Sequence, residues 1–178
     1  EARSSGSRNF FDSIGAEWDS LRTVFNDGEL RSRAISRLAE PGQKILDVGT
    51  GTGILALDLA RLGMDVIGVD NSTSMLEAAQ AKRDAQPLGR GSITLERAEA
   101  HELPFPDGHV DAVLAHMVLH SLASPLDAIA EMARVVRTEG RVIVADFVAH
   151  RHEWMRNELG VLWLGFDIDA VSGWFREA

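Results

Sequence analysis

A run of glycines at alternate positions places the strongest constraint on how this chain folds. The segment Ile45–Gly53 has the sequence ILDVGTGTG, so an apolar run leads directly into three glycines. Residues 54–60 follow with the apolar spacing of a helix. Glycine is needed where a turn adopts positive φ or where a ligand lies against the backbone, so we predict a strand, a tight cofactor-binding turn and a helix. The plainer alternative is a turn that only closes a strand–helix unit.

The spacing of these glycines distinguishes between cofactors. A dinucleotide-binding turn has the pattern GxGxxG, which from Gly49 needs a third glycine where the chain has Ile54. The chain instead has GxGxG, preceded by the acidic Asp47. It thereby resembles the class I S-adenosylmethionine (SAM)-dependent methyltransferases, whose first motif is an apolar run, an acid and GxGxG. SAM has no phosphate, so close backbone and a nearby carboxylate suit its sulfonium and zwitterionic methionine end.

This resemblance implies a fold, a cofactor and part of a site. It implies an α/β fold with a doubly wound, mostly parallel, Rossmann-like sheet, with SAM as methyl donor and S-adenosylhomocysteine (SAH) as product. The first-motif residues that are expected to contact the cofactor are Asp47, Gly49, Thr50, Gly51 and Gly53. The segments LPFPD, VLH and DFxxH are most similar to the type 11 small-molecule branch and to methyltransferase domains fused to winged-helix, metalloregulator-type repressors.

An acid at the end of the next predicted strand extends the expected nucleoside site. This strand covers Met64–Asp70 and ends in Asp70. The carboxyl ends of adjacent parallel strands lie side by side, so the Asp70 carboxylate is placed beside the glycine turn. We expect it to accept hydrogen bonds from both ribose hydroxyls of an adenosine; the alternative is an exposed loop acid.

The residues after this strand begin a helix. Ser72 or Ser74 is a candidate N-cap, and Ser74 with Glu77 matches a capping box. Asn71 and Met75 are expected to contact the cofactor, Met75 against the adenine face, although a methionine at a helix start also suits an ordinary core position.

A second motif follows the predicted third strand, Ser92–Glu96. Residues 98–107 have the sequence AEAHELPFPD, which resembles the family segment GDAxxLPF, whose acid accepts from the adenine amino group. The resemblance therefore places Glu99 and Ala100 at the cofactor. The chain departs from the family pattern because Ala98 replaces the usual glycine and Glu99 the usual aspartate, which keeps the acceptor on a longer arm.

The fourth strand, Val110–Ala115, is an apolar run of the buried type. It leads to His116 and Met117, which the resemblance places at the methionine end of SAM. A helix is expected to begin at Ser124–Pro125 and to end at residues 138–140, and the fifth strand is expected at 141–147.

We predict a single domain over residues 1–178. Its three parts are an N-terminal helical part (1–44), the Rossmann-like core (45–147) and a helical, acceptor-side segment (148–178). The aromatic helix at 10–18 is either a lid over the cofactor or, with a second helix at 29–40, a cover for the sheet. The antiparallel strand pair with which the family fold closes is apparently missing.

Histidines near the carboxyl edge of the sheet are the candidate general bases. A base is needed only if the acceptor must lose a proton, and His120 and His150 are the candidates; a structural role for each is the alternative. A metal site of His116, His120, Asp146 and His150 is a further alternative, because His116 and His120 have the i, i+4 spacing of one helical face. The favoured interpretation includes no metal.

Composition limits the partners. The net charge of −9 without a basic cluster disfavours direct contact with nucleic acid. The chain has no cysteine, which excludes thiolate sites, and no apolar run long enough to span a membrane. We expect a cytoplasmic location and a small-molecule acceptor, and assembly into a homodimer stays open.

The sequence thus favours a SAM-dependent methyltransferase that moves a methyl group to an unidentified small molecule by in-line displacement. Two alternatives stay open at this point. One is a non-catalytic SAM-binding regulatory module fused to a DNA-binding domain, and the other is a nicotinamide-dependent oxidoreductase.

Overall fold

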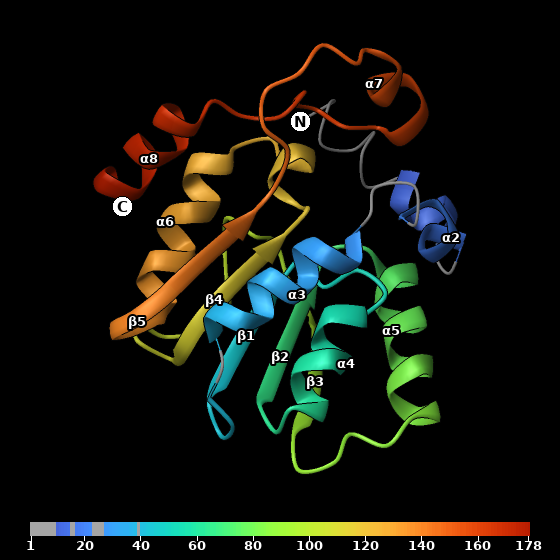
Figure 1. The fold of residues 1–178 in the computed structure, drawn as a ribbon, viewed down its shortest axis with the longest axis vertical. Coiled ribbons are helices and arrows are strands. Elements are labelled where there is room, and N and C mark those ends of the chain that lie inside the picture. Colours follow the sequence, from blue (N-terminus) through green and yellow to red (C-terminus); the bar gives the residue numbers. More distant parts are fainter. Residues whose placement is uncertain (1–9, 15–16, 23–26, 39) are drawn as a thin grey trace.

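Strands and helices alternate along the chain in the computed structural model, which describes residues 10–14, 17–22, 27–38 and 40–178 (Figure 1). Residues 10–14 are helical. The further elements are α2 (Trp18–Arg22), α3 (Asp27–Leu38), β1 (Lys44–Val48), α4 (Ile54–Arg61), β2 (Asp65–Asp70), α5 (Thr73–Ala85), β3 (Ser92–Arg97), β4 (Val110–His116), the 3-10 helix η3 (Leu119–Ser121), α6 (Pro125–Val135), β5 (Val136–Ala145), α7 (Trp154–Leu159) and α8 (Ile168–Glu177).

The five strands form one parallel sheet in the order β3-β2-β1-β4-β5. β1 is central, and Val48 at its end pairs with Val69 of β2 and with Ala115 of β4. The direction in which strands are added reverses between β1 and β4, and ligands bind outside the carboxyl ends of the strands at such a switch point. The predicted doubly wound sheet is confirmed.

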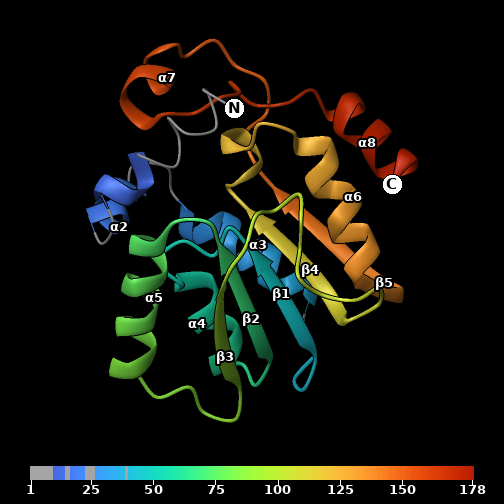
Figure 2. The same ribbon diagram turned by 180° about the vertical axis from the view of Figure 1, so that it is seen from behind.

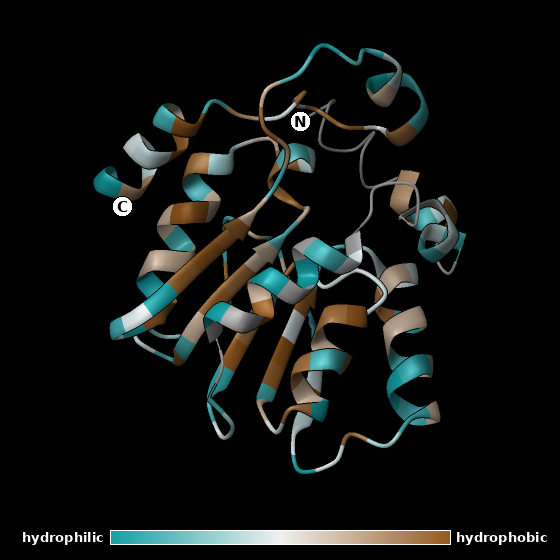
Figure 3. Ribbon diagram, in the orientation of Figure 1, coloured by the Kyte–Doolittle hydropathy of each residue, from teal (hydrophilic) through white to brown (hydrophobic). Residues whose placement is uncertain are grey.

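Helices cover both faces of the sheet (Figures 1 and 2). α3 and α4 lie on one face and α6 on the other. Leu55 and Leu59 belong to the apolar core on the α4 side, and Ile129 and Met132 belong to the core under α6. The central strands β1 and β4 are hydrophobic over most of their length (Figure 3), as expected for strands that are buried on both faces.

The helix expected from Ser124 to residues 138–140 is shorter than predicted. α6 ends at Val135, and β5 begins at Val136, the next residue. The β-branched Val136 pairs with Val110 of β4, so strand pairing overrides the helical pattern here. Residues 138–140 therefore belong to a strand, and the prediction that they end the helix is wrong.

Beyond β5 the chain passes over the carboxyl edge of the sheet and forms α7 and then α8 (Figure 1). Val148 and Phe166 form an isolated bridge at the base of the excursion that carries α7. No further strand follows β5 in residues 146–178, all of which the structure describes. Among the described helices, none has the length and apolar character that a membrane span requires.

The first glycine of the turn after β1 lies where two chain segments approach closely. Gly49 has a φ of 70°, a conformation that side chains rarely adopt. A Cβ atom at this position would overlap the side chain of Val118, which follows β4. Gly49 is therefore required both for the backbone conformation and for the approach of the β4 loop.

Replacement of Gly49 by alanine tests this constraint. Gly49→Ala should reduce the free energy of unfolding by about 2–4 kcal/mol, because a left-handed residue and an overpacked contact each cost about 1–3 kcal/mol. Adding Val118→Ala should restore part of this loss, because it removes Val118 Cγ2, the atom nearest to the added Cβ. Gly173→Ala in α8, where nothing lies within 4 Å of the added Cβ, is the control and should be neutral or stabilising. Equal denaturant midpoints for Gly49→Ala and the wild type would contradict the account.

Candidate active site

The glycine turn after β1 folds back against β2. The N–H groups of Gly49 and Thr50 both donate to the carbonyl oxygen of Val69, at 2.8 and 2.9 Å. The Thr50 hydroxyl donates to the buried carboxylate of Asp47, with 2.7 Å between Oγ1 and Oδ2. Asp47 therefore fixes the shape of the turn at the end of β1.

The carboxylate of Asp70 joins this turn to the one that follows β2. Its Oδ2 accepts from the N–H of Gly51 at 2.8 Å, and its Oδ1 accepts from the N–H of Ser72 at 2.9 Å. Burial raises the pKa of Asp70, and the nearby Asp12 raises it further, whereas the bonds from Ser72 and Gly51 lower it. A carboxylate offers about four acceptor positions, so Asp70 retains the capacity to accept from a ligand.

Residues from three segments line the same cavity beside Asp70. Met75 lies in the first turn of α5 and is buried, and Ser72, not Ser74, caps this helix by accepting from the N–H of Met75. The side-chain nitrogen of Asn71 donates to Oε2 of Glu99 at 3.0 Å. All the cofactor residues expected from the sequence except Gly53 border this cavity, namely Asp47, Gly49, Thr50, Gly51, Asp70, Asn71, Met75, Glu99, Ala100, His116 and Met117.

The chain turns sharply after β4. Met117 has a φ of 57°, and its N–H donates to the carbonyl oxygen of Ala145 at 2.7 Å. His116 is the last residue of β4, whereas His120 lies in η3. The expectation that these two histidines share one helical face is therefore wrong, because the left-handed turn at Met117 separates them.

A buried histidine–aspartate pair lies on this side, and its histidine, His120, borders the cavity. His120 Nδ1 and Asp146 Oδ1 are 2.8 Å apart, and both side chains are at least 95% buried. Asp146 follows β5, and its Oδ1 also accepts from the N–H of Phe147 at 2.8 Å. This contact orients the imidazole, and an ionised Asp146 favours the tautomer that carries its proton on Nδ1 and leaves Nε2 as an acceptor.

His150, the second candidate base, lies elsewhere. The Phe147 ring centroid is 5.0 Å from the ring of His120 and 5.5 Å from that of His150. His120 borders the cavity and His150 does not. Burial lowers the pKa of His150, and electrostatic interactions with His152 and His120 lower it further.

The proposed metal ligands do not come together as one set. Of the four side chains, His120 and Asp146 are in direct contact. Within the described part of the chain, no three His, Cys, Asp or Glu side chains are arranged to hold a metal ion. The alternative of a site made of His116, His120, Asp146 and His150 is therefore not supported.

Two segments outside the central sheet cover the cavity. Phe11 and Trp18 border it, and their rings meet edge to face with centroids 5.2 Å apart. This position favours the lid interpretation of the N-terminal aromatic segment. Met155, Leu159 and Val161, from α7 and the chain after it, form an apolar wall opposite the glycine turn. Apolar spacing alone did not distinguish these wall residues from ordinary core.

Polar contacts that the sequence did not indicate fasten the N-terminal segment. Asp19 accepts from the hydroxyl of Thr52 at 2.6 Å and forms an ion pair with Lys82. Asp12 accepts from the hydroxyl of Ser72 at 2.5 Å. These acids link residues 10–14 and 17–22 to the glycine turn and to α5, which residue spacing in one dimension cannot reveal.

The residues that line the cavity share an acidic and apolar character. Its acids are Asp47, Asp70 and Glu99, and no lysine or arginine is among the described residues that line it. Such a lining favours a cationic or neutral ligand over a polyphosphate.

Comparisons with known proteins agree with this geometry. The model of the methyltransferase domain family matches residues 46–144. The ubiquinone/menaquinone biosynthesis C-methyltransferase UbiE of Citrifermentans bemidjiense is 31% identical over 148 residues, which cover 79% of this chain and 62% of that protein. A demethylmenaquinone methyltransferase of Beutenbergia cavernae is 35% identical over 141 residues, which cover 77% and 56%. The chain thus spans less than two thirds of either relative.

The fold comparison points the same way. The structure of the YcgJ protein of Bacillus subtilis matches with a TM-score of 0.77 at 21% identity, over 84% of this chain and 67% of that one. The family match extends from β1 into β5 and includes the glycine turn, Asp70 and Glu99. The chain therefore belongs to the methyltransferase domain family, with the class I fold whose cofactor is SAM.

Proposed function

We propose that this chain binds SAM in the cavity and promotes transfer of its methyl group to a small-molecule acceptor. In this proposal Asp70 accepts from the ribose hydroxyls, while Met75, Glu99 and Ala100 contact the adenine. The glycine turn and the backbone at His116 and Met117 contact the methionine end. The observation that carries the proposal is that these groups, from four separate segments, border one cavity.

The residues present fit SAM better than a nicotinamide dinucleotide. A pyrophosphate on the glycine turn would lie between Asp47 and Asp70, with no lysine or arginine from the described lining to offset its charge. A sulfonium in the same place is favoured by these carboxylates. The N–H of Gly51, which could otherwise hold a phosphate, already donates to Asp70.

The His120–Asp146 pair supports catalysis in addition to binding. SAM, when bound, supplies an electrophilic methyl group on a positively charged sulfur. With Asp146 accepting the Nδ1 proton of His120, Nε2 would take the proton that the nucleophilic atom of the acceptor loses when it is methylated, and SAH would be the leaving group. The apolar wall and the aromatic segment exclude water from this side of the cavity.

The lining also narrows the proposed acceptor. The wall formed by Met155, Leu159 and Val161 favours an apolar body, and the lack of lysine and arginine among the described lining residues disfavours a carboxylate or phosphate. A neutral acceptor with an ionisable hydroxyl meets both conditions. The relatives named as demethylmenaquinone methyltransferases make a quinol of that kind the first acceptor to test.

A non-catalytic SAM-binding module is the second candidate, because the adenosyl side of the cavity does not itself require turnover. Calorimetric titration with SAM, SAH and NAD, followed by mass spectrometry after incubation with SAM and demethylmenaquinol, separates the candidates. We expect SAH to bind, NAD not to bind, and a product heavier by one methylene. Binding of SAH without product from any acceptor would favour the module, and binding of NAD alone would overturn the proposal.

Replacing Asp70 tests the nucleoside site. Asp70→Ala should weaken SAH binding by about 1–3 kcal/mol, the cost of losing a charged hydrogen-bond acceptor. Asp65→Ala is the matched control, because Asp65 is exposed at the opposite end of β2, where it accepts from the hydroxyl of Ser92. Titration calorimetry measures both variants. Unchanged SAH affinity in Asp70→Ala would remove Asp70 from the site.

Replacing His120 tests catalysis separately from binding. His120→Ala should lower kcat on the accepted quinol by about 10²–10⁴-fold, the usual contribution of a general base, while SAH affinity stays within about twofold. The double variant His120→Ala/Asp146→Asn should have nearly the same kcat as His120→Ala, because the carboxylate acts through the imidazole. His150→Ala should retain activity. If His150→Ala loses activity while His120→Ala stays active, His150 and not His120 is the general base.

A further inference from the structure

The loop between β3 and β4 connects the proposed adenine contacts to α6. Its first residues, Ala98 to His101, border the cavity. The N–H of Ala98 donates to the main-chain oxygen of Asp70 at 3.1 Å, and Glu99 and Glu102 form an isolated bridge that closes a tight turn. The end of the loop that borders the cavity is thus hydrogen-bonded to β2. The conformation of this end also depends on how the other end of the loop is held.

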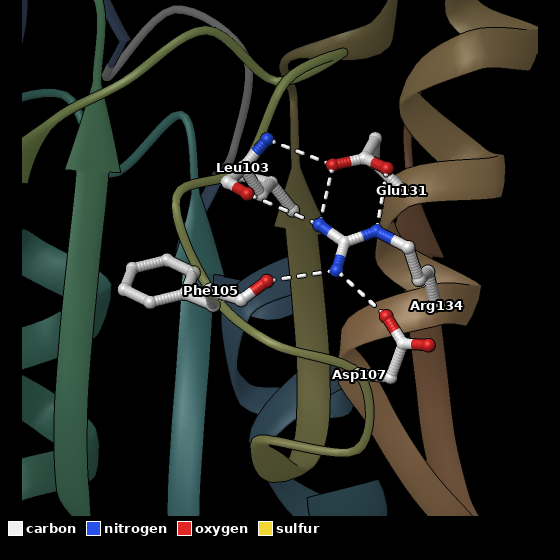
Figure 4. Close-up of polar contacts among 5 residues, drawn as sticks. All are labelled: Leu103, Phe105, Asp107, Glu131 and Arg134. Carbon is white, nitrogen blue, oxygen red and sulfur yellow. Dashed lines mark hydrogen bonds and ion pairs between the residues drawn. The ribbon is translucent and has the colours of Figure 1, made fainter.

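That other end is held by two side chains of α6 (Figure 4). Glu131 Oε2 accepts from the N–H of Leu103 at 2.8 Å. The guanidinium of Arg134 donates to the main-chain oxygens of Leu103 and Phe105, at 3.1 and 2.7 Å, and to the carboxylate of Asp107 at 3.0 Å. Three positions of the loop are therefore fixed to one helix.

Arg134 uses its complete set of donors in these contacts. An arginine side chain has five N–H groups in a planar fork. Nε and Nη2 each donate to one oxygen of Glu131 at 2.7 Å, and the other three N–H groups donate to the loop. Pro104 and Pro106 have no backbone N–H, so the loop has few donors of its own, and the guanidinium takes their place.

We propose that Arg134 is a positioning residue for cofactor binding, which holds the loop so that Glu99 and Ala100 keep their places at the cavity. It does not touch the cavity and acts through Leu103, Phe105 and the turn closed by Glu102. This inference rests on the proposed function, because it takes Glu99 and Ala100 to be contacts of the adenosyl group. Lysine cannot replace Arg134, since a single ammonium cannot reach a carboxylate and two carbonyls in this planar arrangement.

A double-mutant cycle with SAH as the probe tests this role. Arg134→Lys should weaken SAH binding by about tenfold, equivalent to the loss of one hydrogen bond to a charged group. In a Glu99→Gln background the same change should weaken SAH binding by less than about threefold, because the contact that Arg134 positions is already impaired. In an Asp70→Asn background it should still weaken SAH binding by about tenfold. A merely structural role for Arg134 would give the same loss in both backgrounds.

Controls make each outcome decisive. Arg137→Lys alters an arginine–carboxylate pair with Asp111 that does not border the cavity, and it should leave SAH affinity unchanged. If Arg134→Lys does not fold by circular dichroism, Glu131→Gln, which preserves side-chain shape, takes its place in the cycle. If the folded Arg134→Lys variant binds SAH with wild-type affinity, or if its loss of affinity adds fully to that of Glu99→Gln, the role of Arg134 is overturned. The proposed function is not affected by either result. Failure of the wild type to bind SAH would overturn the proposed function as well.

Discussion

The close approach of the glycine turn to the loop after β4 is the constraint on which the site depends. β1 is hydrogen-bonded to strands on both sides, and its turn is tied to β2 by two bonds to the Val69 carbonyl. Gly49 leaves no room for a side chain beside Val118. The ends of β1, β2 and β4 are therefore fixed relative to one another, and the groups that they carry are preorganised at one edge of the sheet.

The polar groups at this edge divide into two sets with different surroundings. Asp70 and Glu99 lie among backbone N–H groups and an amide, which suits the recognition of hydroxyl and amino groups. The side chains of His120 and Asp146 are at least 95% buried and paired with each other, beside an apolar wall. Burial strengthens electrostatic interactions, so a positioned imidazole has more effect there than it would in water. The cavity thus combines an adenosyl side with a reaction side.

Much of this could be predicted from the sequence because local patterns determine it. Alternate glycines, apolar strand runs and the acid that ends β2 predicted the sheet, and together with the family resemblance they predicted eleven cofactor residues that border the cavity. The start of β5 was missed, because pairing of Val136 with Val110 overrides the local helical pattern. The contact of His120 with Asp146 and the donors of Arg134 depend on tertiary packing, and no spacing along the chain encodes them. Asp146 was expected inside the fifth strand, at 141–147, and as a metal ligand, not as the partner of the His120 imidazole alone.

The central claim is that an adenosyl group lies between the glycine turn and Asp70. A crystal structure of the protein with SAH tests it most directly. The account predicts both ribose hydroxyls about 2.6–3.2 Å from the Asp70 carboxylate, with the adenine beside Met75 and Glu99. An adenosyl group bound in any other part of the molecule would contradict it.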